Sequence, residues 1–119
     1  MGFLALSRRA LRDLEDIERY TTEKWGKSVA LQYLDKVQHA LHLLETDPGL
    51  LASRPEFSNH LRFYRVEKHF LICAVDGTNV FVLAVRHGAM DLPSRVAELE
   101  PTLEKEVAIL HQAYLVGRR

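Results

Sequence analysis

The stretch "LRFYRVEKHFLICAVDGTNVFVLAV" at residues 61–85 decides the fold, because it holds three runs of β-type residues in a row. Runs rich in valine, isoleucine and aromatic residues are typical of strands. Only "EK" separates the first run (61–66) from the second (69–75), and "DGTN" separates the second from the third (80–85). Connections this short make tight turns, and the glycine of "DGTN" allows the positive φ that hairpin turns require. The stretch therefore predicts three sequential antiparallel strands.

Two amphipathic helices are predicted ahead of these strands. Ser7 can cap the first helix, whose apolar positions recur at three- and four-residue steps: Ala10, Leu11, Leu14, Ile17 and Thr21. Its outer face is predicted to be solvated charge: Arg12, Asp13, Glu15, Asp16 and Arg19. Gly26 suits the residue that ends a helix, and Ser28 can cap the second one. The inner face of the second helix is Ala30, Tyr33, Leu34, Val37, Leu41 and Leu44, and "DPG" at 47–49 ends it. The short connection implies an antiparallel helical hairpin.

The remaining segments flank this core. Residues 3–6, "FLAL", can form a further strand, and residues 50–60 are predicted to be a loop. After the strands, Asp91 can cap a short helix, and Thr102 can cap a last helix with the apolar stripe Leu103, Val107, Leu110 and Tyr114. We therefore predict an α+β fold, in which an N-terminal strand and a two-helix hairpin pack on an antiparallel β-sheet, with a C-terminal helical tail. Residues 1–96 form the main domain, and residues 97–119 form a helical extension of it.

Composition narrows the class of function. The chain has 119 residues, 47% of them apolar and 27% charged, which is typical of one globular domain. Cys73 is the single cysteine, so a reducing compartment fits. The opening "GFLAL" is too short for a signal-peptide core, and no apolar run is long enough to span a membrane, so we expect a soluble cytoplasmic protein. Lysine plus arginine equals aspartate plus glutamate, at 16 each, which argues against nucleic-acid binding.

Five basic side chains on or at the ends of the predicted strands form the constellation most able to carry chemistry: Arg62, Arg65, His69, Arg86 and His87. Arginine and histidine together can hold a phosphate and move protons, as RNA cleavage through the 2′-hydroxyl requires. The alternative, which we favour, is a polar rim of the sheet that faces a partner. His39 and His42 lie three residues apart without further ligands at metal-binding spacing, and Cys73 is expected to be a buried thiol. No metal or cofactor site is predicted.

The chain resembles the ParE branch of the RelE/ParE toxin superfamily, the toxin halves of bacterial type II toxin–antitoxin (plasmid stabilisation) pairs. The resemblance is carried by "LSRRALRDLEDIERYTTEKWG" at 6–26, by "YLDKV" and "LLETDPGL" in and after the second helix, by "LRFYRVEKHFLICAVDG" and by "VLAVRHGAMDLPSRV". It extends from Leu6 to Val96. The fold that it implies, two helices packed on an antiparallel sheet, agrees with the fold predicted from the residues.

The resemblance also implies a mechanism. RelE-like members cleave mRNA on the ribosome with arginines, lysines and often a C-terminal tyrosine, whereas ParE-like members show no established nuclease chemistry and are thought to poison DNA gyrase. After the last strand this chain has "HGAMD" at 87–91, which is similar to the ParE branch. Two residues depart from the ParE pattern: Cys73 stands where many members have a tyrosine, and Arg86 where they have a leucine.

The leading hypothesis is a toxin that inhibits DNA gyrase and is neutralised by a cognate ParD-like antitoxin, with no direct sequence-specific nucleic-acid binding. The alternatives are a RelE-like ribosome-dependent mRNA endoribonuclease and a non-toxic protein that only binds its antitoxin. The candidate residues for binding the antitoxin or the target are Arg62, Arg65, His69, Arg86, His87, Met90, Leu103, Val107 and Leu110.

Both faces of the predicted sheet need cover. The run "HFLICAV" is apolar at every position after His69, and "VFVLAV" has the same character, which is typical of strands buried on both sides. The helical hairpin can cover only one face. We expect the other face to be covered either by the antitoxin or by the chain's own apolar stripe Leu99, Leu103, Val107, Leu110 and Tyr114.

Overall fold

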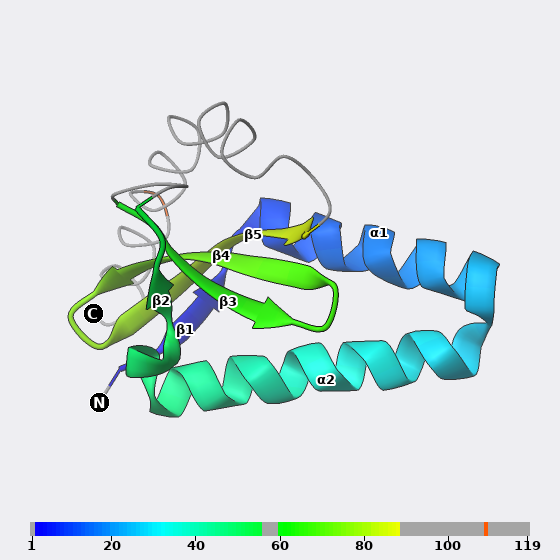
Figure 1. Ribbon diagram of the computed structural model, residues 1–119, viewed down its shortest axis with the longest axis horizontal. Coiled ribbons are helices and arrows are strands. Elements are labelled where there is room, and N and C mark those ends of the chain that lie inside the picture. Colours follow the sequence, from blue (N-terminus) through cyan, green and yellow to red (C-terminus); the bar gives the residue numbers. More distant parts are fainter. Residues whose placement is uncertain (1, 56–59, 89–108, 110–119) are drawn as a thin grey trace.

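The computed structural model describes residues 2–55, 60–88 and Ile109, and among them two helices lie on one face of a five-stranded sheet (Figure 1). The elements in chain order are β1 (Leu4–Leu6), α1 (Arg8–Trp25), α2 (Lys27–Thr46), the short 3₁₀ helix η1 (Pro48–Leu50), β2 (Ala52–Ser53), β3 (Arg62–Val66), β4 (His69–Asp76) and β5 (Asn79–His87). The predicted α+β class and the helical hairpin on a sheet are confirmed.

The sheet has the strand order β1-β5-β4-β3-β2. The three predicted strands, β3 to β5, are antiparallel neighbours as expected. The N-terminal strand β1 is also present, but it runs parallel to β5, with Leu4 opposite Val80, so the sheet is mixed. β2 lies within the segment predicted as a loop and pairs antiparallel with β3. A strand of two residues is too short to show an alternating pattern in the sequence.

Ser7 caps α1, as predicted. Its Oγ accepts a hydrogen bond from the Ala10 N–H at 3.0 Å and donates one to the Leu83 carbonyl of β5 at 2.7 Å, so the cap also ties the helix to the sheet. The buried and half-buried stripe of α1 is Ala10, Leu14, Ile17 and Thr21. Leu11, which we predicted in this stripe, is instead 47% exposed, because one residue rotates a side chain by about 100° around the helix.

Gly26 alone connects α1 to α2. It has the positive φ expected at this position, 96°, and its carbonyl accepts the hydrogen bond of the Ala30 N–H at 3.1 Å. Gly26 is therefore both the C-cap of α1 and the N-cap of α2. The prediction that Ser28 caps α2 is wrong, because α2 begins at Lys27 and Ser28 already lies inside it. The sequence "DPG" ends α2 as predicted, with Asp47 as the C-cap.

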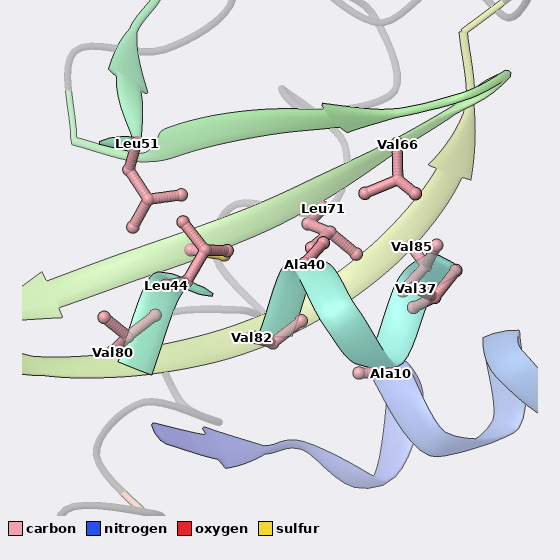
Figure 2. Close-up of a cluster of buried hydrophobic side chains, with 11 residues drawn as sticks. Ala10, Val37, Ala40, Leu44, Leu51, Val66, Leu71, Val80, Val82 and Val85 are labelled. Carbon is pink, nitrogen blue, oxygen red and sulfur yellow. The ribbon is translucent and has the colours of Figure 1, made fainter. Parts of the chain in front are cut away.

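Each face of the sheet carries its own apolar cluster. In the helix-side cluster, α2 places its buried residues over the sheet, as Figure 2 shows for Val37, Ala40 and Leu44. The second-face cluster, on the opposite side of the sheet, consists of Leu61, Phe63, Phe70, Ile72, Phe81, Leu83 and Ala84, all of them buried. The two-residue alternation of a strand separates the two sets.

A β-bulge in β5 adjusts this alternation. Ile72 of β4 pairs with Ala84, whereas Cys73 pairs with Val82, so Leu83 is an extra residue in β5. As a result, Leu83 and Ala84 both lie in the second-face cluster.

Three of the predicted features lie outside the described residues. They are the short helix capped by Asp91, the last helix that starts at Thr102, and the apolar stripe of the extension 97–119. Among the residues that are described, no helix is long and apolar enough to cross a membrane.

Candidate partner-binding site

The five basic residues predicted on the strands do not gather in one place. Arg62 stands apart at the start of β3, where its guanidinium donates to the Leu61 carbonyl at 3.2 Å. Arg65 and Arg86 belong to one row of paired residues across the sheet, and His69 and His87 belong to the next row. The strands therefore do not form a single site in which all five groups could hold a phosphate and move protons.

Arg65 and Arg86 lie on either side of Phe70. Phe70 of β4 pairs with Arg65 of β3 and with Arg86 of β5. The Arg65 guanidinium lies 5.6 Å from the centre of the Phe70 ring in a cation–π contact, and its Nε donates to the Glu67 carbonyl at 2.9 Å. Because Arg65 is exposed, it offers an accessible and well-oriented cation at this end of the sheet.

Arg86 pairs with Asp13 of α1. Its Nη1 lies 3.9 Å from Oδ1 of Asp13, and Oδ2 of Asp13 accepts a hydrogen bond from the Val85 N–H at 2.9 Å. Burial raises the pKa of Asp13 and outweighs the opposite effects of the Val85 N–H and of Arg86. The Arg86 side chain is only 25% exposed. Arg86 therefore links β5 to α1, whereas we had predicted it on an exposed rim of the sheet.

His69 and His87 face each other where β4 begins and β5 ends. They are paired residues, and their ring centres are 5.1 Å apart. The Tyr33 hydroxyl of α2 lies 2.5 Å from Nδ1 of His69 in a short hydrogen bond. Burial, and secondly the charge of His87, lower the pKa of His69 to about 4, so its imidazole is neutral at pH 7. Burial raises the pKa of Tyr33, so its hydroxyl keeps its proton. The hydrogen bond between Tyr33 and His69 is therefore a neutral polar connection between α2 and the sheet.

A groove of about 480 Å³ opens beside this pair, between the Gly26 end of the helical hairpin and the β3–β4 turn. We call it the hairpin groove. Its apolar and aromatic lining comes from Ile17, Tyr20, Trp25, Val29 and Tyr33, and its polar lining from Asp16, Thr21, Lys24, Glu67, Lys68, His69 and His87. Of the predicted residues, the groove therefore includes His69 and His87.

The aromatic part of the groove was absent from the predicted site. Trp25 is 62% exposed and Tyr20 is 59% exposed. Both residues lie off the apolar stripe of α1, where single apolar residues on a surface are common and carry no meaning on their own. The available signal was the spacing: Tyr20 lies one helical turn before Lys24, and Trp25 lies between Lys24 and the glycine that ends the helix.

Cys73, His39 and His42 have the burial or exposure that we expected for them. The exposed fraction of Cys73 is 0%, which confirms that its thiol is buried. Burial raises the pKa of this thiol. His39 and His42 are exposed on α2. Within residues 2–55 and 60–88, no group of three or more histidine, cysteine, aspartate or glutamate side chains could hold a metal ion. The candidates Met90, Leu103, Val107 and Leu110 lie outside the described residues.

The arrangement first defines a class: a small α+β domain whose helical hairpin covers one face of a mixed sheet and presents an aromatic groove at its end. Residues 4–92 match the family model described as the ParE toxin of the type II toxin–antitoxin system, parDE. Because this match covers well over half of the chain, the chain belongs to the ParE toxin family. The resemblance found in the sequence is confirmed.

Similarity to individual proteins supports this family assignment. The chain is 29% identical over 97 residues to Toxin ParE1 of Caulobacter vibrioides, which covers 72% of this chain and 88% of the relative. It is 26% identical over 98 residues to Toxin ParE3 of the same organism, and this match covers 82% of this chain and 98% of the relative. A chain of the solved structure "Chromosomal ParDE TA system from P. aeruginosa" superposes with a TM-score of 0.65 at 21% identity, covering 73% of this chain and 96% of that one. This last likeness shows the fold.

Proposed function

We propose that this ParE-family toxin inhibits DNA gyrase and is neutralised by a cognate ParD-like antitoxin. The observation that carries the proposal is the family match over residues 4–92. An antitoxin partner is further supported by the structural neighbour, whose title names a ParDE toxin–antitoxin system. Gyrase acts on chromosomal DNA, so the site of action that we propose is the bacterial cytoplasm.

The described residues favour action by binding rather than by catalysis. Cleavage of RNA needs a cation that clamps the phosphate next to groups that transfer protons. In this chain Arg86 is engaged by Asp13, and Arg62 and Arg65 project from separate positions of β3. Gly88, which follows the last strand, has no side chain that could transfer a proton. Arg65 and His87 are exposed, and they are the side chains of the predicted set that we propose for partner contacts.

The proposal is tested by inducing the chain in bacteria without its antitoxin. We expect filamentation, DNA breaks and a DNA-damage response, while mapped mRNA ends stay unchanged. Purified toxin should also block supercoiling by gyrase, and added antitoxin should restore it. Arg65→Ala together with His87→Ala should weaken this inhibition, whereas the matched control Arg12→Ala, an exposed arginine on α1, should leave it unchanged.

Two outcomes would overturn the gyrase assignment. Codon-linked cleavage of mRNA on induction would assign the chain to the ribosome-dependent endoribonucleases. Normal growth, with gyrase unaffected and the antitoxin still bound, would identify a protein that keeps only the antitoxin-binding function.

A further inference from the structure

His69 and His87 form a fixed pair at one end of the sheet, because they are direct partners in the register of β4 and β5. The Gly88 N–H donates to the Lys68 carbonyl at 2.7 Å, so this backbone hydrogen bond lies beside the histidines, and the two histidines are a non-hydrogen-bonded pair. In antiparallel pairs of this kind the side chains stand on the same face of the sheet and approach each other most closely. The backbone therefore presents two imidazole rings together.

The separation of the two rings suits a shared metal ion. The ring centres are 5.1 Å apart, and the ring planes are inclined at 79°. Two imidazoles that bind one tetrahedral zinc ion, with Zn–N distances of about 2.0–2.1 Å, have ring centres roughly 5 Å apart. His87 is exposed, and exposed side chains change rotamer rapidly, so its ring can turn a nitrogen toward such an ion. The two strands therefore hold the rings at a distance that suits chelation.

Tyr33 supports His69 in the way that metal-binding histidines are supported. The Tyr33 hydroxyl is hydrogen-bonded to Nδ1 of His69, which leaves Nε2 as the ring nitrogen that can bind a metal ion. The hydroxyl can accept from Nδ1–H because the Val66 carbonyl, at 3.4 Å, can accept the proton of the hydroxyl. A histidine that binds a metal commonly donates its other ring N–H to such a partner, which fixes its tautomer and its orientation.

The histidine pair can be reached through the hairpin groove. Both histidines line this groove of about 480 Å³, which leaves room for water on the remaining positions of a metal ion. The lining also contains the carboxylates of Asp16 and Glu67. The ammonium groups of Lys24 and Lys68 balance these two charges, so a divalent cation that enters the groove meets no excess of positive charge.

The nature of the two ligands selects the class of metal. Imidazole nitrogen suits zinc, copper and nickel, whereas magnesium and calcium prefer oxygen ligands. Among the described residues, no third histidine, cysteine, aspartate or glutamate joins the pair in a cluster that could hold a metal. An ion bound by two histidines keeps open positions for water or for a side chain of a partner, unlike the closed four-ligand sites of structural zinc.

We propose that His69 and His87 form a two-histidine site for a divalent transition-metal ion such as zinc, which joins the start of β4 to the end of β5 and faces the hairpin groove. This site goes beyond the proposed function, because it needs neither gyrase nor an antitoxin. Since only the folded chain brings the two histidines together, binding of the ion stabilises the fold.

The test measures binding of Zn²⁺ to the full-length toxin, purified without a histidine tag. Titration calorimetry should detect saturable binding of one ion per chain, and the same Zn²⁺ concentration should raise the melting temperature. His87→Gln removes the exposed ligand and should raise the Kd for Zn²⁺ at least about tenfold, because even the loss of an outer partner of a ligand has an effect of that size. The rise in melting temperature should disappear with it.

Two controls accompany this variant. His39→Gln removes a histidine that is also exposed but lies on α2, and the Kd for Zn²⁺ should stay within about twofold of the wild-type value. Mg²⁺ at the same concentration should leave the melting temperature unchanged, because it prefers oxygen ligands.

Three results would overturn the site. If the wild-type toxin shows no saturable binding of Zn²⁺, the pair does not chelate. If His87→Gln leaves the affinity unchanged, the ion is bound elsewhere, and a loss in His39→Gln would place it on α2 beside His42. If Mg²⁺ raises the melting temperature as much as Zn²⁺, the effect is a general response to divalent charge. The proposed function stands in each case, because these measurements contain the toxin alone.

Discussion

At the scale of single residues, Asp13 links the first helix to the last strand through two different contacts. One carboxylate oxygen accepts the Val85 N–H, and the other lies near the Arg86 guanidinium. The β5 edge beyond the short strand β1 would otherwise leave this N–H without a strand partner. Ser7, six residues earlier, has a similar role, because its hydroxyl donates a hydrogen bond to the Leu83 carbonyl. The cap of α1 and one polar side chain within α1 therefore each hydrogen-bond to the backbone of β5.

Only the local half of these contacts can be predicted from the sequence. The Ser7 cap follows from the residue type and its place before an apolar-periodic segment, and the structure confirms it. Its second bond, and both bonds of Asp13, join residues more than 70 positions apart. Asp13 has the spacing of a solvated residue, yet its side chain is only 13% exposed, because α1 runs along the edge of β5.

His69 makes stability depend on pH. Its pKa falls from 6.5 to about 4 on folding, so between these values the unfolded state binds more protons than the folded state. The stabilising contribution is fully present above pH 6.5 and is lost as the pH falls toward 4. Asp13 acts with the opposite sign, because its raised pKa makes its ionisation unfavourable to the fold as the pH rises above 3.8.

We therefore expect the free energy of unfolding to fall as the pH is lowered from 7 to 4.5, and to fall less steeply in His69→Gln. Glutamine keeps an acceptor for the Tyr33 hydroxyl but cannot take up a proton. Chemical denaturation at several pH values measures the two slopes. Equal slopes in the two proteins would show that His69 is not the group responsible, and His39→Gln, which changes an exposed histidine of α2, serves as the control.

At the scale of elements, the long and strongly patterned segments are the predictable ones. β3, β4 and β5 lie within about two residues of the predicted runs, since their β-branched and aromatic residues and tight turns are local signals. The parallel pairing of β1 with β5 is not local, because it depends on α1 and α2 returning the chain to the far edge of the sheet. The start of α2 was misplaced because a serine is a common cap, whereas a glycine shared by two helices has no separate pattern.

Gly26 gives a quantitative prediction at this scale. Its φ of 96° and ψ of 163° lie in a region that essentially only glycine occupies, and a Cβ at this position would meet no atom within 4 Å. Gly26→Ala should therefore destabilise the protein through backbone strain alone, by about 1–3 kcal/mol. Gly77, in the β4–β5 turn, also has open space but has a φ of 61°. Its replacement by alanine should cost about 1–2 kcal/mol.

Thermal and chemical unfolding of the two glycine variants measure these values. Gly77→Ala is the control for Gly26→Ala, because both variants add the same methyl group to open space. A difference between their free energies of unfolding therefore reflects backbone conformation. A Gly26→Ala variant as stable as the wild type would mean that the two helices can be joined by another backbone conformation, and that the hairpin does not depend on this glycine.

At the scale of the whole molecule, the fold and two of the residues that line the hairpin groove could be predicted, whereas the groove as a unit could not. The strand ends correctly indicated His69 and His87 as neighbours, because paired strands bring their ends together. Trp25 and Tyr20 join them only because the fold brings the end of α1 next to the β3–β4 turn. Side-chain spacing along one helix contains no information on that placement.

The two faces of the sheet lead to the last prediction. α1 and α2 both cover the helix-side cluster (Figure 2), yet Phe63, Phe70 and Phe81 on the second face are also buried. Large apolar side chains each gain about 1.5–3 kcal/mol when they leave water, so a sheet face that contains three phenylalanines needs a cover. The family match ends at residue 92, and residues 97–119 beyond it carry the apolar stripe described above.

We expect the extension to provide that cover, alone or together with the antitoxin, so deleting residues 98–119 should make the isolated toxin less soluble and change its affinity for the antitoxin. Light scattering, thermal unfolding and binding measurements on the full and shortened chains test this. As a control, replacing the apolar stripe by Leu103→Ser, Val107→Ser and Leu110→Ser in the full-length chain should have the same effect, because length alone should not matter. A shortened toxin that stays monomeric, equally stable and equally tight in antitoxin binding would show that the second face is covered without the extension. The buried phenylalanines would then have to be protected by residues before position 98.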